Sequence, residues 1–489
     1  MLFNSYEFIF AFLPITFFIY YYLNQKRLTE ASKGFLVFSS LFFYSWWNIN
    51  YLPIILSSML FNYIVGNSLN NTTKNHHRFS KKSLLIFGIT LNLILLGYFK
   101  YTNFMIENLN YWFFTDNVPN IDIALPLAIS FFTFQQISYL VDSYRQETKE
   151  YDFLNYALFV TFFPQLIAGP IVHHKEMMPQ FSKTRNKVKN YKNIALGLFI
   201  FSIGLFKKVV IADTFAVWAT AGFDVATTLN LFEAWATSLS YTFQLYFDFS
   251  GYTDMAIGLA LLFNIRLPVN FNSPYKATDI QDFWRRWHIT LSRFLKDYVY
   301  IPLGGNRKGE FRTYNNLMAT FIIGGIWHGA GWTFIFWGFL HGLALVIHRA
   351  WSKLGFKLWT WLAWLITFNF INVAWIFFRA KDWEDAIKVL GGMFNLGNIM
   401  LPIQFNIKLS FLHECGIKFG DFIGEIGGDI SIFFWISAAL SLVLLGKNSI
   451  YFLTKNMNVW FVTLGACLFS YAMLKSLASS SQVFLYFNF

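Results

Sequence analysis

Long apolar runs, each nearly free of charged residues, recur along the whole chain and constrain its fold more than any other feature. A helix of about 20 such residues matches the roughly 30 Å hydrocarbon layer of a bilayer. Only 13% of the 489 residues are charged, whereas soluble domains carry about 25%, so most of the surface has to face lipid rather than water. The sequence therefore predicts an all-α integral membrane protein that crosses the bilayer many times.

We expect about ten to twelve crossings from the apolar segments that have the length of a span. Two of these segments, 231–263 and 317–348, are too long for one straight crossing, so each is expected to tilt, to kink or to contain a re-entrant section. The other candidate spans are 8–23, 35–48, 52–69, 84–99, 123–140, 153–171, 194–211, 358–378, 430–445 and 460–474.

The formal net charge is +12, and the basic side chains gather in short loops between the apolar segments. Lys and Arg hold such loops on the cytoplasmic side, whereas a nucleic-acid-binding protein collects them on one surface. We therefore predict no nucleic-acid partner. Residues 1–7 lack Lys and Arg, whereas Lys26, Arg27 and Lys33 follow the first span, so both termini are expected to be extracytoplasmic. The basic loops also hold histidines that we expect to be solvated, His76, His77, His173 and His174.

Residues 379–429 form the main polar stretch, which we expect to be an extracytoplasmic insert. It contains five Lys or Arg against seven Asp or Glu, a balance of −2 that contrasts with the basic loops. Apolar residues recur in it at helical spacing, so part of it could lie as a helix on the outer membrane surface. A simple connector is an equally open interpretation. The spaced residues are Trp383, Ala386, Ile387, Leu390 and Phe394.

The sequence Gly-Gly-Ile-Trp-His-Gly-Ala-Gly-Trp at 324–332 lies inside an apolar segment. An ionisable side chain within a bilayer is costly, so it normally faces the protein interior and marks a functional site. The glycines allow close approach and a break in the helix. Imidazole titrates near neutral pH, so His328 can take a proton from a hydroxyl and return it; a structural histidine is the alternative. Trp327, Trp332 and His341 are candidates for supporting this site.

A basic, tryptophan-rich block covers 279–297. Its spacing favours an interfacial helix with arginines at the lipid headgroups and Trp rings at the boundary. Alternatively, its cations bind the phosphates of a cytosolic cofactor, because the guanidinium fork suits phosphate oxygens. By spacing alone, His288 can be a hydrogen-bonded structural histidine. The candidate substrate-binding or cofactor-binding residues of the block are Asp282, Trp284, Arg285, Arg286, Ser292, Arg293 and Lys296.

Two apolar segments carry signs of a broken helix. Pro164 and Pro170 exclude a continuous helix across 153–171, and a re-entrant loop lining a cavity would tolerate the irregular backbone. Asp248 and Asp254 lie within another apolar segment and could relay protons, as in a transporter. We favour a structural role, in which both carboxylates accept backbone N–H groups and hold a helix break, because small and polar residues interrupt the segment there.

The sequence lacks a phosphate-binding loop, a zinc-binding His pair and a nucleophile elbow. Its two cysteines, Cys415 and Cys467, lie in a polar and an apolar segment. We therefore predict no disulfide, no metal and no permanently bound cofactor.

With its motifs in this order, the chain resembles the membrane-bound O-acyltransferases, and within that family the bacterial branch of the AlgI type. The resemblance spans nearly the whole chain. The motifs that carry it are Phe-Phe-Pro-Gln-Leu-Ile-Ala-Gly-Pro at 162–170, Asp-Phe-Ser-Gly-Tyr-Thr-Asp-Met-Ala at 248–256, Asp-Phe-Trp-Arg-Arg-Trp-His-Ile-Thr-Leu-Ser at 282–292, Tyr-Ile-Pro-Leu-Gly-Gly at 300–305, Trp-His-Gly-Ala-Gly-Trp at 327–332, the opening Phe-Asn-Ser-Tyr-Glu-Phe at 3–8 and the closing Phe-Leu-Tyr-Phe-Asn-Phe at 484–489.

The resemblance implies a single membrane domain, 1–489, in which tilted, re-entrant and interfacial helices surround a central funnel open to the outer face. The catalytic histidine of the family falls on His328. Its second polar residue falls on His288, within a cytoplasmic or interfacial catalytic segment at 276–312. We predict that His328 acts as the base, and that His288 orients the reacting groups or donates a hydrogen bond to the developing oxyanion.

The resemblance also implies the reaction and its partners. The donor would be an acyl thioester in the cytosol, such as acetyl-CoA, and the acceptor an extracytoplasmic glycan, either an alginate-like exopolysaccharide or peptidoglycan. The expected location is the bacterial inner membrane, among membrane lipid. Transfer would run directly or through a periplasmic SGNH-type acetyltransferase partner such as AlgJ, AlgX or PatB.

Three alternatives stay open at this point. The acyl group could be D-alanine, transferred to a cell-wall polymer. The chain could be a proton-coupled transporter, although we find no paired halves with corresponding broken helices. It could also be a non-catalytic membrane anchor for an external acyltransferase.

Overall fold

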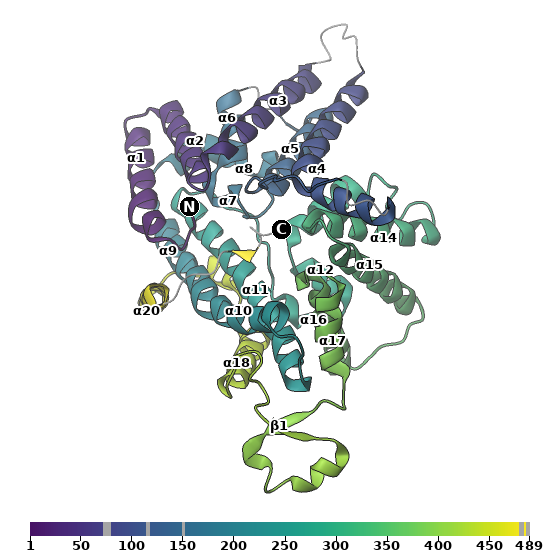
Figure 1. Cartoon of the computed structure of the whole chain (residues 1–489). Helices are drawn as coiled ribbons and strands as arrows, with labels where there is room; N and C mark the ends of the chain where they lie inside the picture. The colour runs from purple at the N-terminus through teal and green to yellow at the C-terminus, as the bar shows by residue number, and fades with distance from the viewer. Residues whose placement is uncertain (72–79, 114–117, 149–151, 479–483, 486–489) are drawn as a thin grey trace. The chain divides into compact units, whose positions relative to one another are not determined.

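The computed structural model describes residues 1–71, 80–113, 118–148, 152–478 and 484–485 (Figure 1). Helices make up nearly all of the regular structure in these residues. The strands described are β1 (Met400–Pro402) and β2 (Lys418–Gly420), which pair in parallel with Met400 opposite Lys418. The prediction of an all-α membrane protein with several spans is confirmed.

Seven helical segments of the described chain are long and apolar enough to cross a membrane, and the apolar helix Ser431–Leu445 is shorter. Crossings beyond these seven stay a prediction, because the remaining helices are shorter or more polar. The seven segments are Glu7–Gln25, Ile49–Asn70, Lys81–Phe113, Tyr191–Val225, Trp332–Lys353, Thr360–Arg379 and Val459–Ala478.

The chain divides into two compact units. Unit 1 comprises Met1–Leu205, Tyr252–Val269 and Phe452–Ser470. Its helices are η1 (Glu7–Phe12), α1 (Leu13–Gln25), α2 (Thr29–Ser45), η2 (Ile49–Tyr51), α3 (Leu52–Asn71), α4 (Lys81–Phe113), α5 (Ile129–Tyr144), α6 (Phe153–Thr161), α7 (Phe163–Leu166), α8 (His174–Ser182), η3 (Thr184–Lys187) and α9 (Tyr191–Phe206).

Unit 2 comprises Phe206–Gly251, Asn270–Tyr451 and Tyr471–Phe489. Its helices are η4 (Lys207–Ala212), α10 (Asp213–Thr220), η5 (Ala221–Val225), η6 (Pro274–Lys276), α12 (Ile280–Arg286), α13 (Ile289–Leu295), η7 (Lys296–Tyr300), α14 (Glu310–His328), α15 (Trp332–Lys353), α16 (Thr360–Arg379), α17 (Trp383–Phe394), η8 (Ile403–Phe405), η9 (Ser410–Cys415) and α18 (Ser431–Leu445). The chain passes between the units at the last residue of α9 and within α11 (Leu231–Leu262), α19 (Ser449–Leu453) and α20 (Val459–Ala478).

Phenylalanine rings form the core near the N-terminus of unit 1. The rings of Phe3 and Phe43 stack with their centroids 5.5 Å apart, and Phe8 meets Phe43 edge-on at 5.6 Å. Phe163 of α7 meets Phe8 edge-on at 6.0 Å. Such offset and edge-on geometries match the charge distribution of aromatic rings and stabilise a core beyond the area they bury. The opening motif and Phe163 of the 162–170 motif are thus held in one cluster.

The helix expected over 153–171 is broken, as its prolines predicted. Helix α6 ends at Thr161, α7 has a single turn, and residues 167–173 are not helical. A Cβ at Gly169 would lie 2.4 Å from the Cα of Gln165, so the turn requires glycine there. That this irregular backbone lines a cavity stays a prediction.

The prediction that His173 and His174 are solvated is wrong, because both are buried. Nδ1 of His173 lies 3.6 Å from Oδ2 of Asp142, and the ring of His174 meets that of Phe159 edge-on at 5.2 Å. Burial lowers the pKa of His174 to about 4. The neighbouring basic residues suggested an exposed loop, but the turn before α8 directs both imidazoles inward. Two further histidines of this prediction lie outside the described residues, His76 and His77.

Helix α11 runs without interruption from Leu231 to Leu262, so the predicted break around Asp248 and Asp254 is wrong. Asp248 instead forms an ion pair with Lys208, with 2.9 Å between the charged atoms. Lys208 also pairs with Asp213 at 2.7 Å. A buried carboxylate needs a partner, and here a lysine supplies it, so the helix keeps its own backbone hydrogen bonds.

The break predicted within 317–348 is confirmed. Helix α14 ends at His328 and α15 begins at Trp332, with extended backbone at Gly329 and Gly331 between them. The two helices then pack side by side (Figure 1). Glycines allow the close approach, since a Cβ at Gly325 or at Gly338 would lie 2.4 Å from a carbonyl oxygen of the facing helix.

The insert expected over 379–429 opens with helix α17, as the apolar spacing predicted. Its buried face differs from the expected one, because Ala386, Val389 and Met393 are buried whereas Ile387 and Phe394 are 62% and 64% exposed. The sequence showed which residues are apolar but not which of them the rest of unit 2 would cover.

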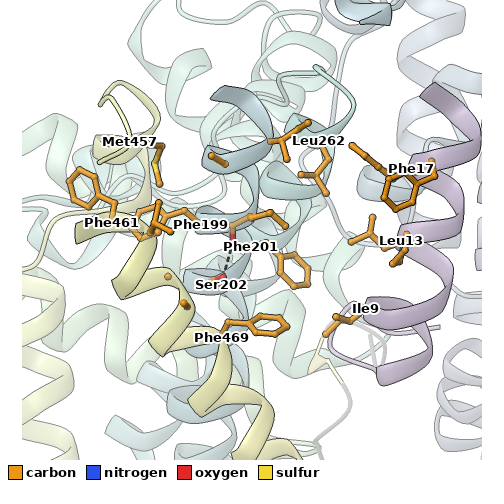
Figure 2. Close-up of a pocket in the computed structure, with 18 residues that line it drawn as sticks. Ile9, Leu13, Phe17, Phe199, Phe201, Ser202, Leu262, Met457, Phe461 and Phe469 are labelled. Atoms are coloured by element: carbon orange, nitrogen blue, oxygen red, sulfur yellow. Dashed lines mark hydrogen bonds between the residues drawn. The ribbon is translucent and has the colours of Figure 1, made fainter. Parts of the chain in front are cut away.

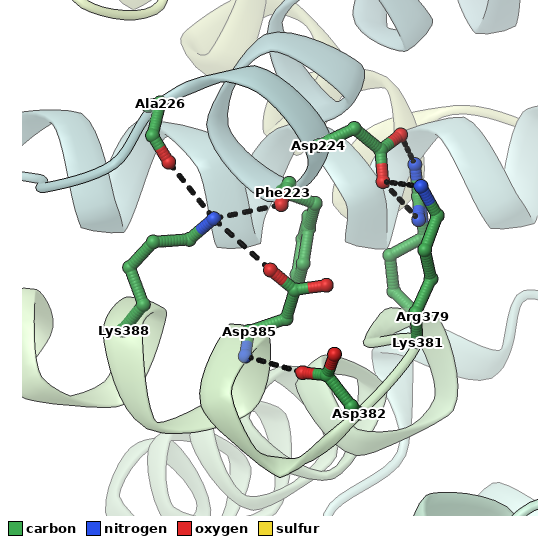
Figure 3. Close-up of polar contacts among 8 residues, drawn as sticks. All are labelled: Phe223, Asp224, Ala226, Arg379, Lys381, Asp382, Asp385 and Lys388. Carbon is green, nitrogen blue, oxygen red and sulfur yellow. Dashed lines mark hydrogen bonds and ion pairs between the residues drawn. The ribbon is translucent and has the colours of Figure 1, made fainter.

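Polar contacts hold α17 to the end of η5 (Figure 3). The Lys388 ammonium donates to the carbonyl oxygens of Phe223 and Ala226 at 2.7 and 2.9 Å. Asp224 pairs with Arg379 and, at 3.0 Å, with Lys381. Cations at the C-terminal end of a helix satisfy its last carbonyls and oppose its dipole, so these contacts fix the start of the insert.

Candidate active site

Three histidines of unit 2 meet through two tryptophan rings. The ring of Trp327 meets that of His328 at 4.8 Å and that of His288 at 6.4 Å. The ring of Trp337 meets His328 at 5.2 Å and His341 at 4.8 Å. We call these five residues the histidine–tryptophan cluster. The two histidines predicted to be catalytic and one predicted to support them are therefore brought together by α14, α15 and the junction of α12 and α13.

His328 lies where α14 ends, and its position follows from the glycines beside it. A Cβ at Gly329 would lie 2.2 Å from the ring of Phe334, so this turn requires glycine. The imidazole is 4% exposed and is enclosed edge-on by three aromatic rings, the third being Phe378 at 5.0 Å. Aromatic walls exclude water, which strengthens electrostatic interactions at the ring.

His288 connects α12 to α13 in a left-handed conformation, with φ 42°. Its side chain is fully buried, and Nδ1 lies 3.1 Å from Oδ1 of Asn270. The same oxygen accepts the backbone N–H and the hydroxyl of Thr290, at 3.2 and 3.0 Å. A backbone N–H can only donate, so this atom of Asn270 is the acceptor oxygen, and Nδ1 of His288 has to carry the proton.

Nε2 of His288 is consequently the unprotonated nitrogen of a neutral ring. It is buried and accepts no hydrogen bond from the described residues. Burial at the junction of α12 and α13 lowers the pKa of His288 to about 3. At neutral pH its Nε2 can therefore accept a hydrogen bond from a substrate but has none to donate.

His341 is buried one helical turn after Trp337 on α15. The Trp284 Nε1–H donates to its Nδ1 at 3.2 Å, and the two rings meet edge-on at 5.1 Å. This bond makes Nδ1 the acceptor and places the ring proton on Nε2. Trp284 thus packs against two members of the cluster, His341 and Trp337.

The other candidate residues of the 279–297 block lie around this cluster. Asp279 caps α12 by accepting the N–H of Asp282 at 2.7 Å, and Asp282 pairs with Arg286 at 2.8 Å. Arg285 is exposed and makes no ion pair within the described chain. The Ser292 hydroxyl contacts the carbonyl oxygen of Trp287 at 3.5 Å.

Two further candidates are more exposed than the histidine–tryptophan cluster. Arg293 is partly exposed on α13, and Trp332, at the start of α15, is 52% exposed. The block therefore has a buried side that carries Trp284 and His288, and an outer side that carries its cations. The interfacial-helix interpretation and the phosphate-binding interpretation both concern the cations of this outer side, and both stay predictions.

Sequence reasoning missed three residues of the site. Asn270 sets the tautomer of His288, but an asparagine in a loop is too common to stand out. Phe378 closes one side of His328 from another helix, α16. Trp337 could have been found, because it precedes His341 by four residues and so shares its helix face.

Comparison with known proteins relates this site to a known family and to several relatives. The model of the membrane-bound O-acyltransferase family matches residues 41–381, which include all three histidines of the cluster. The chain is 52% identical over 520 residues to the peptidoglycan O-acetyltransferase of Helicobacter pylori, covering 100% of this chain and 98% of that protein.

Two further relatives are more distant. The probable alginate O-acetylase AlgI of Pseudomonas aeruginosa is 41% identical over 406 residues, covering 82% of this chain and 76% of that protein. The teichoic acid D-alanyltransferase of Streptococcus thermophilus is 28% identical over 244 residues, covering 46% of this chain and 57% of that protein.

Proposed function

Because this chain belongs to the membrane-bound O-acyltransferase family, we propose that it O-acetylates a hydroxyl of an extracytoplasmic glycan, with peptidoglycan as the favoured acceptor. As a family member it is an O-acyltransferase and a multi-pass membrane protein. The observation that carries the choice of acceptor is the identity of 52%, over the full length, to a peptidoglycan O-acetyltransferase. The relatives named for alginate and for D-alanine are less similar and cover less of this chain.

We propose a cytosolic thioester, acetyl-CoA, as the donor. The acceptor hydroxyl oxygen attacks the thioester carbonyl carbon, and His328 takes the hydroxyl proton as the carbon–oxygen bond forms. The tetrahedral intermediate then collapses, its carbon–sulfur bond breaks, and His328 returns the proton to the leaving thiolate. One alcohol and one thioester yield one ester and one thiol, so the step balances without an oxidant. Because a thioester is already an activated acyl group, we propose that the step uses no metal and no permanent cofactor.

His288 and Trp337 are proposed to position and stabilise the reacting groups. The buried Nε2 of His288, an acceptor, supports a role in orienting the hydroxyl rather than in donating to the oxyanion. Trp337 is the proposed donor to the oxyanion. Its indole N–H is buried and has no hydrogen-bond partner in the described residues, and its ring meets that of His328 edge-on. Indole is a donor only, which is what an oxyanion requires.

We propose that the chain lies in the bacterial inner membrane with both termini outside, and that an SGNH-type periplasmic partner takes part in the transfer. Residues 379–429 are the favoured docking segment. Its exposed apolar side chains support this assignment, among them Ile407 at 93%, Phe411 at 62% and Leu396 at 74% exposed. Exposed apolar surface of this kind marks an interaction site or a membrane contact.

The proposal is tested with the purified full chain in detergent, radiolabelled acetyl-CoA and soluble peptidoglycan fragments, with and without the partner. Replacing His328 by Ala should lower acetyl transfer by about 10²- to 10⁴-fold, the usual contribution of a positioned base. The matched control is His348→Ala, on the same segment but outside the cluster, which should keep the normal rate.

Normal transfer by a folded His328→Ala protein would contradict the role of His328 as the base and would favour a non-catalytic membrane anchor. Transfer without a proton gradient would separate the enzyme from the proton-coupled transporter. Labelling with D-alanine in place of acetate would reassign the acyl group.

A further inference from the structure

An apolar crevice of about 600 Å³ lies in unit 1 between α1, α9 and α20 (Figure 2). Its walls are aliphatic and aromatic, with Ser202 as the polar exception, and that hydroxyl is already donated to the carbonyl oxygen of Leu198 at 2.8 Å. Side chains at its mouth, Phe18 and Val462, are 60% and 55% exposed. The crevice therefore opens on the outer surface of three candidate membrane spans, where hydrocarbon is the surrounding solvent.

A second cavity, of about 680 Å³, has the opposite chemistry. Its lining includes five cations and no carboxylate, and four of the cations make no ion pair with described residues. The side chain of Asn264, 5% exposed, fixes its floor by donating to the carbonyl oxygens of Asn186 and Val188 at 3.0 and 2.8 Å. The cations are Lys183, Arg185, Lys192, Arg266 and Lys455.

The two cavities are lined by the same three segments of chain. On α9, Asn193 and Leu196 line the basic cavity, and Ile194, Ala195 and Leu198 line the apolar crevice. Near the end of α11, Leu262 lines the apolar crevice and Arg266 lines the basic cavity. Before α20, Lys455 lines the basic cavity and Met457 lines the apolar crevice. A single ligand with a charged end and a hydrocarbon end can therefore occupy both, since all three segments contribute lining residues to each cavity within a few positions of one another.

We propose that these cavities form a binding site for an anionic diacyl phospholipid, with the phosphate headgroup among the five cations and an acyl chain in the apolar crevice. A basic pocket between membrane helices matches the charge of such a headgroup, and the crevice offers its chain a wall of methyl groups and rings. Zwitterionic lipids lack the net charge that the basic cavity complements. None of the residues of the histidine–tryptophan cluster lines either cavity, so the site is separate from the proposed chemistry.

The test is native mass spectrometry of the purified full chain in detergent, titrated with dioleoyl phosphatidylglycerol or with dioleoyl phosphatidylcholine. The two lipids share their acyl chains and differ in charge. The unmodified chain should retain phosphatidylglycerol in preference. The double variant Lys183→Gln/Arg185→Gln should lower that retention by roughly tenfold or more and leave phosphatidylcholine unchanged. Ala466→Phe, which fills the crevice, should lower retention of both lipids.

The matched control is Lys26→Gln/Lys187→Gln, which removes the same charge at residues that line neither cavity. An equal loss of phosphatidylglycerol retention in this control would overturn the proposal. Unchanged retention in Lys183→Gln/Arg185→Gln would overturn it as well. Full displacement of the lipid by inorganic phosphate or by CoA would also overturn it and indicate a soluble anion as the ligand. The melting temperature of each variant checks folding, and Val462→Phe replaces Ala466→Phe if the latter does not fold.

Discussion

Oδ1 of Asn270 lies 3.1 Å from Nδ1 of His288 and fixes which nitrogen of that ring carries the proton. The relationship makes Asn270 a positioning residue for His288. We expect Asn270→Ala to lower kcat by about tenfold or more, because the ring loses the bond that presents Nε2 as an acceptor.

Asn270→Asp separates positioning from a purely structural role. It keeps the acceptor oxygen but adds a negative charge, which favours a protonated His288, so the pH–rate profile should gain a new limb near neutral pH. A profile that keeps its shape in both Asn270 variants would leave Asn270 with only a structural role.

The low pKa of His288 predicts how stability changes with pH. An unfolded chain takes up this proton as the pH falls through 6.5, whereas the folded chain keeps the ring neutral down to about pH 3, so the fold loses stability between these values. We expect the melting temperature in detergent to fall more steeply from pH 7 to pH 5 than in His288→Gln, which lacks this titration.

The control for this measurement is His348→Gln. This variant removes a partly exposed imidazole outside the histidine–tryptophan cluster and so controls for the loss of a histidine as such. Parallel slopes for the unmodified chain and His288→Gln would show that the buried ring is not the group that titrates.

Trp337→Phe tests the proposed oxyanion donor. The substitution keeps an aromatic ring beside His328 and removes the N–H, so kcat should fall by about 10²-fold while KM for the donor changes little. Trp375→Phe is the matched control, because that ring stacks on Trp337 at 5.7 Å and is equally buried. A similar loss in both variants would assign the effect to packing.

The ion pair between Lys208 and Asp248 predicts an asymmetry between its partners. Lys208→Met leaves the carboxylates of Asp213 and Asp248 without their shared cation and should cost about 3 to 5 kcal/mol of stability. Asp248→Asn keeps an acceptor for the Leu485 N–H, which lies 2.9 Å from Oδ2, and leaves Lys208 paired with Asp213, so its cost should be smaller. Thermal unfolding followed by size-exclusion chromatography compares the two.

This pair also bears on the transporter alternative. A proton relay needs a carboxyl group at residue 248, so Asp248→Asn would abolish any proton-coupled activity. Undiminished acetyl transfer by that variant would agree with the structural role that Lys208 gives the carboxylate.

The sequence predicted best those features that depend on one residue type in one place. Glycines at 329 and 331 predicted the break after His328, and Pro164 predicted the end of α6. Prediction failed where a distant partner decided the outcome. The small and polar residues beside Asp248 suggested a helix break, and the lysine that pairs with its carboxylate was not foreseen because Lys208 lies 40 residues earlier in the chain. His173 looked solvated because its neighbours are charged, but the fold turns it inward.

The same limit applies to the site. The resemblance located His328 and His288, but the tautomer of His288 depends on Asn270, which is 18 residues away in sequence. That role is visible only once the backbone N–H of Thr290 identifies the acceptor oxygen. Similarly, the spacing of α17 showed its apolar residues, whereas the covered face depends on contacts elsewhere in unit 2.

The glycine break after His328 has an electrostatic consequence. His328 is the last residue of α14, where the aligned peptide groups of the helix leave partial negative charge on unpaired carbonyls. A positive charge at such an end is favoured by about 0.3 to 1 kcal/mol, and by up to about 2 kcal/mol where it is partly buried. An imidazole that captures a proton there becomes a cation facing the negative pole of its own helix. A chain that continued as a helix past residue 328 would move that pole away from the ring.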